Sequence, residues 1–301
     1  MRTISRSYMR YCGNNSRSES TCGLNLYGVC SILRPKVKLY ADNHSDYYNA
    51  PLKGFKKKFY RYVCGRTVGK LLGKYAEKVW GVTPWRVIYQ QQVYGVPKEK
   101  SALLVMGGDE NKIKWANRLD VRNSIREKLN IPEEAFVIIT GGKIDKPKNI
   151  HLLVEAIKEI NNPNIYLIIF GRYEADMINF CDSINSPNIL NIGWIKAEDA
   201  YDYFLSSDFA AFPGTHSVLW EQACATGLPA LFKDWDGGFN HIDVGGTCIL
   251  LKEISVQNLM NIVNKVYTDK SFFNSLKNMA ETKGRVEFSY IEIAKRSIGI
   301  K

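Results

Sequence analysis

The chain has 301 residues, 45% hydrophobic and 24% charged, a composition typical of globular proteins that excludes long disorder and collagen-like repeats; at ~150 residues per domain it predicts two domains. No apolar run approaches the ~18 residues of a membrane-spanning helix. The seven cysteines include no Cys-x-x-Cys pair, and the start of the sequence shows no signal-peptide pattern. Both observations favour a reducing, cytoplasmic compartment. The net charge of +11 comes from residues 1–100, which hold 19 Lys and Arg against 5 Asp and Glu, so we expect a localised basic face rather than nucleic-acid binding along the whole chain.

The first third of the chain carries weak periodic patterns. Residues 1–30 show no clear period, and we expect them to be loop or poorly ordered. The other elements expected in this third are a strand at 36–40 that ends at Asp42-Asn43-His44 and strand or helix pieces at 87–93 and 102–106.

Residues 53–78 form the most basic stretch, with nine Lys and Arg against one acidic residue, Glu77, and with interleaved Phe and Tyr. The ordinary interpretation is a solvated basic helix. The alternative is a surface that meets an anionic membrane or a lipid-phosphate acceptor, because each charge near such a surface contributes ~1 kcal/mol. RNA is less favoured, since no RNA-binding motif accompanies the charge.

From residue 136 onward, short apolar runs alternate with segments of helical periodicity. Strands that are apolar on both faces and alternate with helices predict a doubly wound α/β domain, whose ligands bind beyond the carboxyl ends of the parallel strands. The expected strands are 136–140, 165–170, 189–192, 209–212 and 229–232, and the expected helices are 149–160, 176–184, 197–205, 216–226, 255–268, 271–282 and 290–298.

Glycine-rich patterns give little support for the common nucleotide motifs. The run Gly65-Arg-Thr-Val-Gly69-Lys70 lacks the spacing of a phosphate loop and the Ser or Thr that should follow the Lys. No Gly-x-Gly-x-x-Gly follows an expected strand, so nicotinamide or flavin binding is not indicated.

A lysine-rich loop is expected directly after the strand that ends at Thr140. Residues 142–148 hold three lysines, and this loop leaves the carboxyl edge of the sheet. A lysine there is a compact positive charge suited to phosphate oxygens. A solvated surface turn is the ordinary alternative.

The segment 212–227 predicts a strand, a tight turn and a helix closed by Gly227. The helix is expected to begin near 215–217, so that its free N–H groups face the ligand edge. Glu221 then lies one turn into the helix, where a carboxylate can accept two hydrogen bonds from a diol such as ribose; an exposed helical Glu is the alternative. His241 lies in a glycine-rich loop with no partner visible in the sequence, which also shows no metal-ligand cluster.

Together these motifs resemble the GT-B glycosyltransferases of the large retaining family 4, from about residue 36 to 288. In that family a loop Arg and Lys hold the nucleotide diphosphate, and Lys143 and Lys148 match them. The family's Glu-x7-Glu motif binds the ribose through its second Glu, which Glu221 matches. Pro213 stands where the first Glu contacts the donor sugar, and His216 is the best substitute for that Glu.

The resemblance implies roles for particular residues. His44 matches a strand-end His that points into the cleft towards the donor sugar and the acceptor. The implied catalytic residues are His44, Lys143, Lys148 and His216, and the implied donor-binding residues are Gly142, Arg172, Ile195, Gly214, Thr215, Ser217, Val218 and Glu221.

The implied fold is GT-B-like, with a doubly wound parallel-sheet donor domain at the C-terminus and a truncated Rossmann-like N-terminal domain. The expected segments are an atypical N-terminus at 1–30, a partial acceptor-side domain at 31–110, a nucleotide-sugar-binding domain at 111–285 and a returning helix at 286–301.

The implied function is transfer of a sugar from a nucleoside-diphosphate sugar to a glycan or lipid-linked acceptor, with retention and without metal or other cofactor. The short acceptor-side domain leaves two alternatives, an inactive remnant that still binds nucleotide sugar and a module that binds anionic membranes. The expected location is cytoplasmic, either free or peripheral on the inner face of the membrane. Nucleic acid is not an expected partner.

Overall fold

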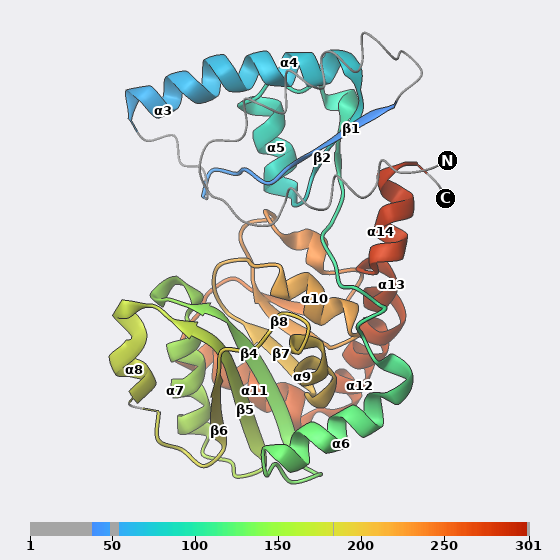
Figure 1. The fold of residues 1–301 in the computed structure, drawn as a ribbon. Helices are drawn as coiled ribbons and strands as arrows, with labels where there is room; N and C mark the ends of the chain where they lie inside the picture. The colour runs from blue at the N-terminus through green and yellow to red at the C-terminus, as the bar shows by residue number, and fades with distance from the viewer. Residues whose placement is uncertain (1–37, 49–53, 183, 300–301) are drawn as a thin grey trace.

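A computed structural model describes residues 38–48, 54–182 and 184–299 and contains two parallel β-sheets, one above the other in Figure 1. The expected segment 1–30 lies outside the described residues. A three-stranded sheet has the order β1-β2-β3, and a six-stranded sheet has the order β6-β5-β4-β7-β8-β9. All their pairings are parallel, which confirms the α/β fold class. The strands are β1 Leu39–Asn43, β2 Ala76–Gly81, β3 Ser101–Leu103, β4 Phe136–Ile144, β5 Ile165–Tyr173, β6 Ile189–Gly193, β7 Phe209–Phe212, β8 Ala230–Lys233 and β9 Cys248–Leu251.

Helices accompany the smaller sheet. The basic stretch forms α3 (Phe55–Phe59), a π-helical segment (Tyr60–Gly65) and α4 (Arg66–Tyr75), and α5 spans Pro84–Gln92. The expected piece at 87–93 is therefore helical, because the Thr83 hydroxyl caps α5 by accepting from the Arg86 N–H and Pro84 occupies its first turn. Strand β1 lies three residues later than expected, and residues 36–37 are outside the described part.

The glycines of the run 65–70 serve packing rather than phosphate binding. Gly69 lies inside α4, and a Cβ there would lie 1.8 Å from the carbonyl oxygen of Tyr94. Glycine is needed because the helix approaches the neighbouring backbone that closely.

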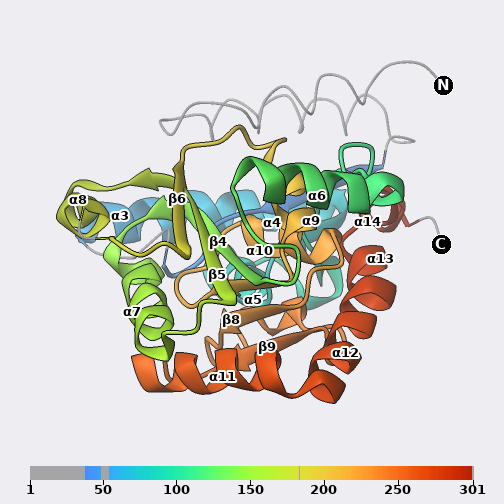
Figure 2. The same cartoon turned by 90° about the horizontal axis from the view of Figure 1, so that it is seen from below.

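The six-stranded sheet is covered on both faces, as Figure 2 shows from below. Successive β4 residues point to opposite faces: Val137 and Ile139 belong to one buried core, and Ile138 belongs to the other. This alternation explains why the strands are apolar throughout. One face packs against α6 (Arg118–Lys128), α9 (Ala200–Ser206) and α10 (Leu219–Ala225), and the other against α7 (Ile150–Ile160), α11 (Val256–Thr268) and α12 (Lys270–Met279).

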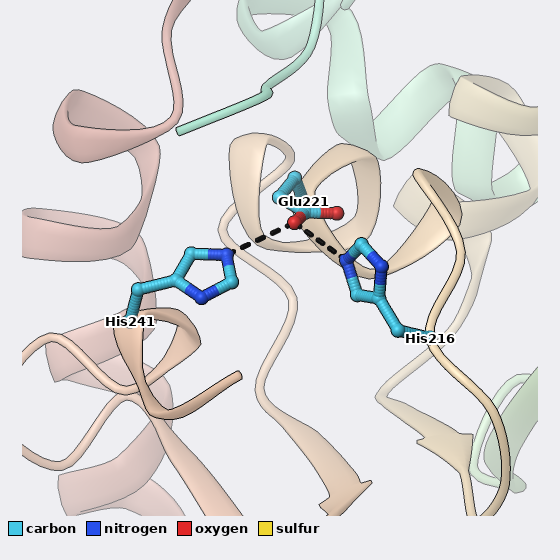
Figure 3. A group of neighbouring side chains, drawn as sticks. All are labelled: His216, Glu221 and His241. Atoms are coloured by element: carbon cyan, nitrogen blue, oxygen red, sulfur yellow. Dashed lines mark hydrogen bonds and ion pairs between the residues drawn. The ribbon is translucent and has the colours of Figure 1, made fainter. Parts of the chain in front are cut away.

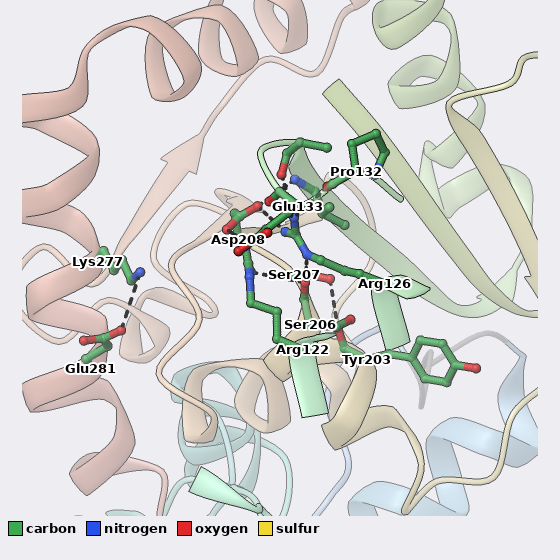
Figure 4. A network of polar contacts seen from close by, with 12 residues as sticks. Arg122, Arg126, Pro132, Glu133, Tyr203, Ser206, Ser207, Asp208, Lys277 and Glu281 are labelled. Atoms are coloured by element: carbon green, nitrogen blue, oxygen red, sulfur yellow. Dashed lines mark hydrogen bonds and ion pairs between the residues drawn. The ribbon is translucent and has the colours of Figure 1, made fainter. Parts of the chain in front are cut away.

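A buried charge network joins α6 to the sheet beside the start of β7 (Figure 4). Arg126, only 3% exposed, donates to Asp208 Oδ2 at 2.8 Å and to the Ser206 carbonyl at 3.1 Å. Asp208 also accepts from Arg122 at 2.8 Å and from the Val137 N–H at 2.8 Å. Both carboxylate oxygens are therefore satisfied, as a charge in a half-buried position requires.

The C-terminal helix α14 (Tyr290–Ser297) runs from the larger sheet towards the smaller one (Figure 1). Trp80 of β2 donates its indole N–H to the Ser297 carbonyl at 3.2 Å. At the other end of α14, the Glu110 carboxylate accepts from the N–H groups of Tyr290 and Ile291 at 3.0 and 2.9 Å. In the described residues no helix is both long and apolar enough to cross a membrane.

Candidate functional site

Two connections at the carboxyl edge of the larger sheet lie against each other. The 3₁₀ turn Lys146–Lys148 follows β4, and residues 213–218 follow β7. The Lys148 ammonium donates to the Thr215 carbonyl at 2.5 Å and lies 3.4 Å from the His216 carbonyl oxygen. In return, the Thr215 N–H donates to the Pro147 carbonyl at 3.2 Å. The two turns therefore hold each other in place.

Gly214 lies at the tightest point between these turns. A Cβ at this position would lie 2.3 Å from the Lys148 Cα, far closer than side-chain atoms approach a backbone. The Gly214 carbonyl also accepts from the Trp235 indole N–H at 3.3 Å. Only glycine lets the turn approach Lys148 this closely.

The Lys148 ammonium is partly buried, which disfavours its charged form. Burial lowers the pKa of its ammonium to about 8, although Asp145 nearby favours the charged form. Its two contacts with carbonyl oxygens place the ammonium beside the 213–218 turn. A partly desolvated ammonium attracts an incoming anion more strongly than an exposed one does.

Glu221, the third residue of α10, is fully buried between two histidines (Figure 3). Its Oε1 lies 2.8 Å from His216 Nε2 and 3.1 Å from His241 Nε2. Burial would raise the pKa of this carboxyl, but the attraction and hydrogen bonds of the two histidines outweigh burial and bring it to about 2. Glu221 is therefore a carboxylate at neutral pH and not the exposed helical Glu of the ordinary interpretation.

Four buried side-chain polar atoms of α10, the turn before it and His241 lack hydrogen-bond partners among the described residues. They are Glu221 Oε2, Ser217 Oγ, Trp220 Nε1 and His241 Nδ1. Unpaired buried polar atoms cost free energy in a folded protein, so they point to a site where a ligand supplies the missing partners.

His216, Glu221 and His241 are also the one group in the described residues whose potential ligand atoms, within 4.8 Å of one another, could hold a metal ion. The sequence shows neither this cluster nor a partner for His241, and the structure supplies that partner in Glu221. His241 is separated from Glu221 by twenty positions, and it reaches the carboxylate only because the loop after β8 folds back over α10. Residue spacing carries no signal for such a contact.

The expected helix start at 215–217 is wrong, because α10 begins at Leu219. The backbone of the preceding turn bonds to Lys148 and Pro147 instead of continuing the helix. The His216 ring stacks on Phe239 with centroids 4.6 Å apart, and its side chain is only 5% exposed. His216 and Ser217 therefore do not form a helix N-terminus that could stabilise a diphosphate.

The expected lysine loop is wrong in part, since β4 continues to Ile144. Gly142 and Lys143 pair in register with Gly171 and Arg172 of β5, and a Cβ on Gly171 would lie 1.9 Å from the Gly142 carbonyl oxygen. The Lys143 ammonium lies 3.7 Å from carboxylate oxygens of both Asp145 and Glu174, and Arg172 is exposed. These cations stand at the carboxyl ends of two neighbouring strands.

The other expected site residues lie around this edge. A Cβ on Gly142 would lie 2.9 Å from Leu219 Cδ1, which places Gly142 at the start of α10. Val218 precedes that helix and is 39% exposed. Ile195 follows β6 and packs on the core beside α9, and no described contact joins it to Lys148 or Glu221.

His44 follows β1 in the other sheet and is exposed. Its Nε2 lies 2.7 Å from Asp42 Oδ2, and this hydrogen bond lowers the pKa of Asp42. The same loop approaches the larger sheet through Tyr48, whose ring lies 5.1 Å from that of Trp235. The structure therefore brings the loop of His44 to the region between the sheets, while no described contact joins His44 itself to Glu221.

An aromatic cluster that sequence analysis missed connects the two sheets. Trp85, at the start of α5, stacks on Tyr48 with ring centroids 4.8 Å apart, and its ring centroid lies 5.3 Å from that of Phe239. The backbone N–H of Trp85 donates to the Gly238 carbonyl oxygen at 3.4 Å. Phe239 in turn stacks on His216, so the cluster reaches from the smaller sheet to the partners of Glu221.

Comparison with known proteins shows which family the chain resembles. Residues 121–285, more than half of the chain, match the model of the family described as glycosyl transferases group 1. A curated relative, the lipopolysaccharide 1,2-N-acetylglucosaminetransferase of Salmonella typhimurium, is 23% identical over 168 residues. That match covers 50% of this chain and 44% of the relative, so the chain spans less than half of its length.

Solved structures share the fold. HepE of Anabaena, in complex with UDP and glucose, gives a TM-score of 0.64 at 16% identity, covering 92% of this chain and 74% of HepE. A glycosyltransferase from Rickettsia africae gives a TM-score of 0.68 at 14% identity, and the match covers 99% of this chain and 87% of that protein. WaaG, a glycosyltransferase of lipopolysaccharide biosynthesis, gives a TM-score of 0.64 at 16% identity, and the match covers 95% of this chain and 85% of WaaG. These likenesses confirm the GT-B-like arrangement of the two sheets.

Proposed function

The chain belongs to the glycosyl transferases group 1 family, and from this premise we propose that it transfers a sugar from a nucleoside-diphosphate sugar to a glycan or lipid-linked acceptor. The observation that carries the proposal is the partly buried Lys148 ammonium, held beside the turn that leads to the buried carboxylate of Glu221. A cation for a diphosphate and an acceptor for ribose hydroxyls thus stand at one sheet edge, where ligands of parallel α/β sheets bind.

In this proposal each residue has a distinct role. Lys148 and Lys143 stabilise the negative charge of the leaving diphosphate, the kind of contribution that usually dominates catalysis. Glu221 accepts from the ribose, Gly142 and Gly214 let the donor approach the backbone, and His44 positions the sugar from the other sheet. The remaining donor contacts are assigned to Arg172, Ile195, Thr215, Ser217 and Val218, and His216 supports Glu221.

The relatives suggest which donors to test first. HepE was solved with UDP and with UDP-glucose, and the Salmonella relative is named for N-acetylglucosamine. Retention at the anomeric carbon and independence of metal are implied by the family resemblance. We place the reaction in the cytoplasm, at the inner face of the membrane if the acceptor is a lipid.

Thermal unfolding with UDP-, GDP-, ADP- and CDP-sugars tests donor binding. A ligand at 100 times its Kd stabilises a protein by ~2.7 kcal/mol, so one base should raise the Tm clearly. We expect Lys148→Ala to lose this shift. The matched control is Lys128→Ala, an exposed lysine at the end of α6 and at the opposite edge of the sheet. A folded wild-type protein whose Tm no nucleotide moves contradicts the proposal.

A second candidate function, binding of an anionic membrane, is favoured by the surface of α3 and α4. Phe55 and Phe59 are 84% and 56% exposed and stand beside the exposed lysines Lys57 and Lys58. Apolar rings that insert and cations that attract anionic headgroups are the two features of an interfacial helix. This surface would bring the site to a lipid-linked acceptor.

A further inference from the structure

The carboxylate of Glu221 is held asymmetrically. Both histidines contact the same oxygen, Oε1, at 2.8 and 3.1 Å, while Oε2 is buried without a partner in the described part of the chain. A carboxylate only accepts hydrogen bonds, so each imidazole must carry a proton on Nε2. The two donors therefore fix which carboxylate oxygen is occupied and which is free.

Packing keeps both imidazoles in place. His216 is sandwiched by the stack on Phe239 and an edge contact with Trp220 at 5.1 Å. His241 lies in the 3₁₀ turn Asn240–Ile242 with its side chain only 2% exposed, and the adjacent Ile242 is fully buried. His216 cannot turn away without disrupting its ring contacts, and the almost complete burial of His241 leaves its ring little room to turn.

We propose that His241, acting with His216, is a positioning residue that holds Glu221 so that the single oxygen Oε2 is presented to a ribose hydroxyl of the bound nucleoside diphosphate. The inference rests on the proposed function, because the ribose is assigned to Glu221 there. It adds a residue from the loop after β8 to the donor site, and it makes the recognition of the ribose depend on a group that does not touch the nucleotide.

Hydrogen bonds account for this cluster better than a bound cation does. Zinc bonds of ~2.0–2.2 Å in tetrahedral geometry would separate neighbouring ligand atoms by about 3.3–3.6 Å. Both imidazole nitrogens instead lie at hydrogen-bond distance from one carboxylate oxygen. The metal content of the purified protein nevertheless provides a direct check.

The test measures Kd by calorimetry for the nucleoside diphosphate that binds the wild-type protein and for its 2′-deoxy and 3′-deoxy analogues. The wild type should bind at least one analogue about tenfold more weakly. In His241→Ala and His241→Asn the ribonucleotide should bind about tenfold more weakly, while the affinity for that analogue stays nearly constant, so that discrimination disappears. In His241→Gln, whose amide N–H can reach the position of Nε2, discrimination should be largely kept.

The outcomes separate the inference from the proposed function. If the folded wild type binds no nucleotide, the proposed function is wrong and the inference falls with it. If the wild type discriminates and His241→Asn, with its shorter amide, discriminates equally well, only the inference is overturned. The Asn and Gln pair keeps the test valid if His241→Ala fails to fold. One equivalent of tightly bound metal in the wild type that is lost in His241→Asn also overturns it, since the nitrogens would then be ligands.

Discussion

Lys148 combines a charge with a position that makes the charge costly. Burial lowers its pKa to about 8, and its hydrogen bonds to the Thr215 and His216 carbonyl oxygens are stronger when the amine is protonated. An ammonium poised near its pKa responds to small changes in pH, and a bound diphosphate would raise its pKa. The cation assigned to the diphosphate should therefore titrate in an accessible range.

Nucleotide affinity should fall as the pH rises through about 8. Below that value Lys148 is protonated in the free protein and attracts the diphosphate; above it, binding must first take up a proton, which costs up to tenfold in affinity per pH unit. Titrations between pH 7.5 and 9.5, where the phosphates are fully ionised, measure this slope. In Lys148→Arg the guanidinium stays protonated, so whatever affinity remains should be flat. A flat wild-type profile across this range contradicts the assignment.

At the level of residues, the sequence predicted where the motifs lie but not which residues contact one another. Lys148, Gly214 and Glu221 were expected at one sheet edge, and the structure places them there. His241 was missed, because its contact with Glu221 depends on how the loop after β8 folds and not on spacing. Its roles, like those of the other site residues, remain predictions.

Among the elements, α3 and α4 stand out because their exposed face mixes aromatic and cationic side chains. Phe55, Phe59 and Tyr62 are all more than 40% exposed, and the Arg66 guanidinium lies 5.7 Å from the Tyr62 ring centroid. An exposed apolar patch of this kind on a helix usually marks an interaction surface. The expectation of a basic helix at 53–78 holds for 55–75, while Ala76–Gly81 form β2.

Vesicle flotation should show that this face binds anionic lipid. The wild type is expected to float with phosphatidylglycerol vesicles at low salt and not with phosphatidylcholine vesicles, because ~1 kcal/mol per nearby charge drives the association. Reversing Lys57 and Lys58 to Glu should weaken binding more than tenfold. Reversing the exposed Lys128 and Lys252 makes the same change in net charge and should have little effect. Equal losses in both double variants would mean that net charge, and not this face, drives binding.

Element types followed from periodicity, while element ends did not. Alternating apolar runs predicted five of the six strands of the larger sheet, because both of its faces are buried, but they missed the edge strand β9. The end of β4 was missed because Gly142 and Gly171 allow the strands to continue in pairing beyond the apolar run. The start of α10 was missed because tertiary contacts to Lys148 and Pro147 occupy the backbone of the preceding turn.

At the scale of the whole molecule, the two sheets meet through a few specific contacts. A Cβ on Gly238 would lie 2.1 Å from the Trp85 indole, and α14 bridges the sheets through Trp80. The family resemblance predicted a GT-B-like arrangement, which the solved structures confirm. The aromatic contacts between the sheets were not predictable, because Trp85 in α5 and Phe239 in the loop after β8 lie far apart in sequence. The domain boundaries remain predictions.

Product formation tests the central claim most directly. The wild type is incubated with the nucleotide sugar whose base raises its Tm and with an extract of membrane glycolipids, and released nucleoside diphosphate and glycosylated product are measured by mass spectrometry. We predict both in equal amounts, a loss of at least a hundredfold in Lys148→Ala, and near-normal turnover in Lys128→Ala. Turnover by Lys148→Ala at the wild-type rate, or a wild type that binds the donor and glycosylates nothing, would contradict the account; the second result would favour a nucleotide-sugar-binding remnant.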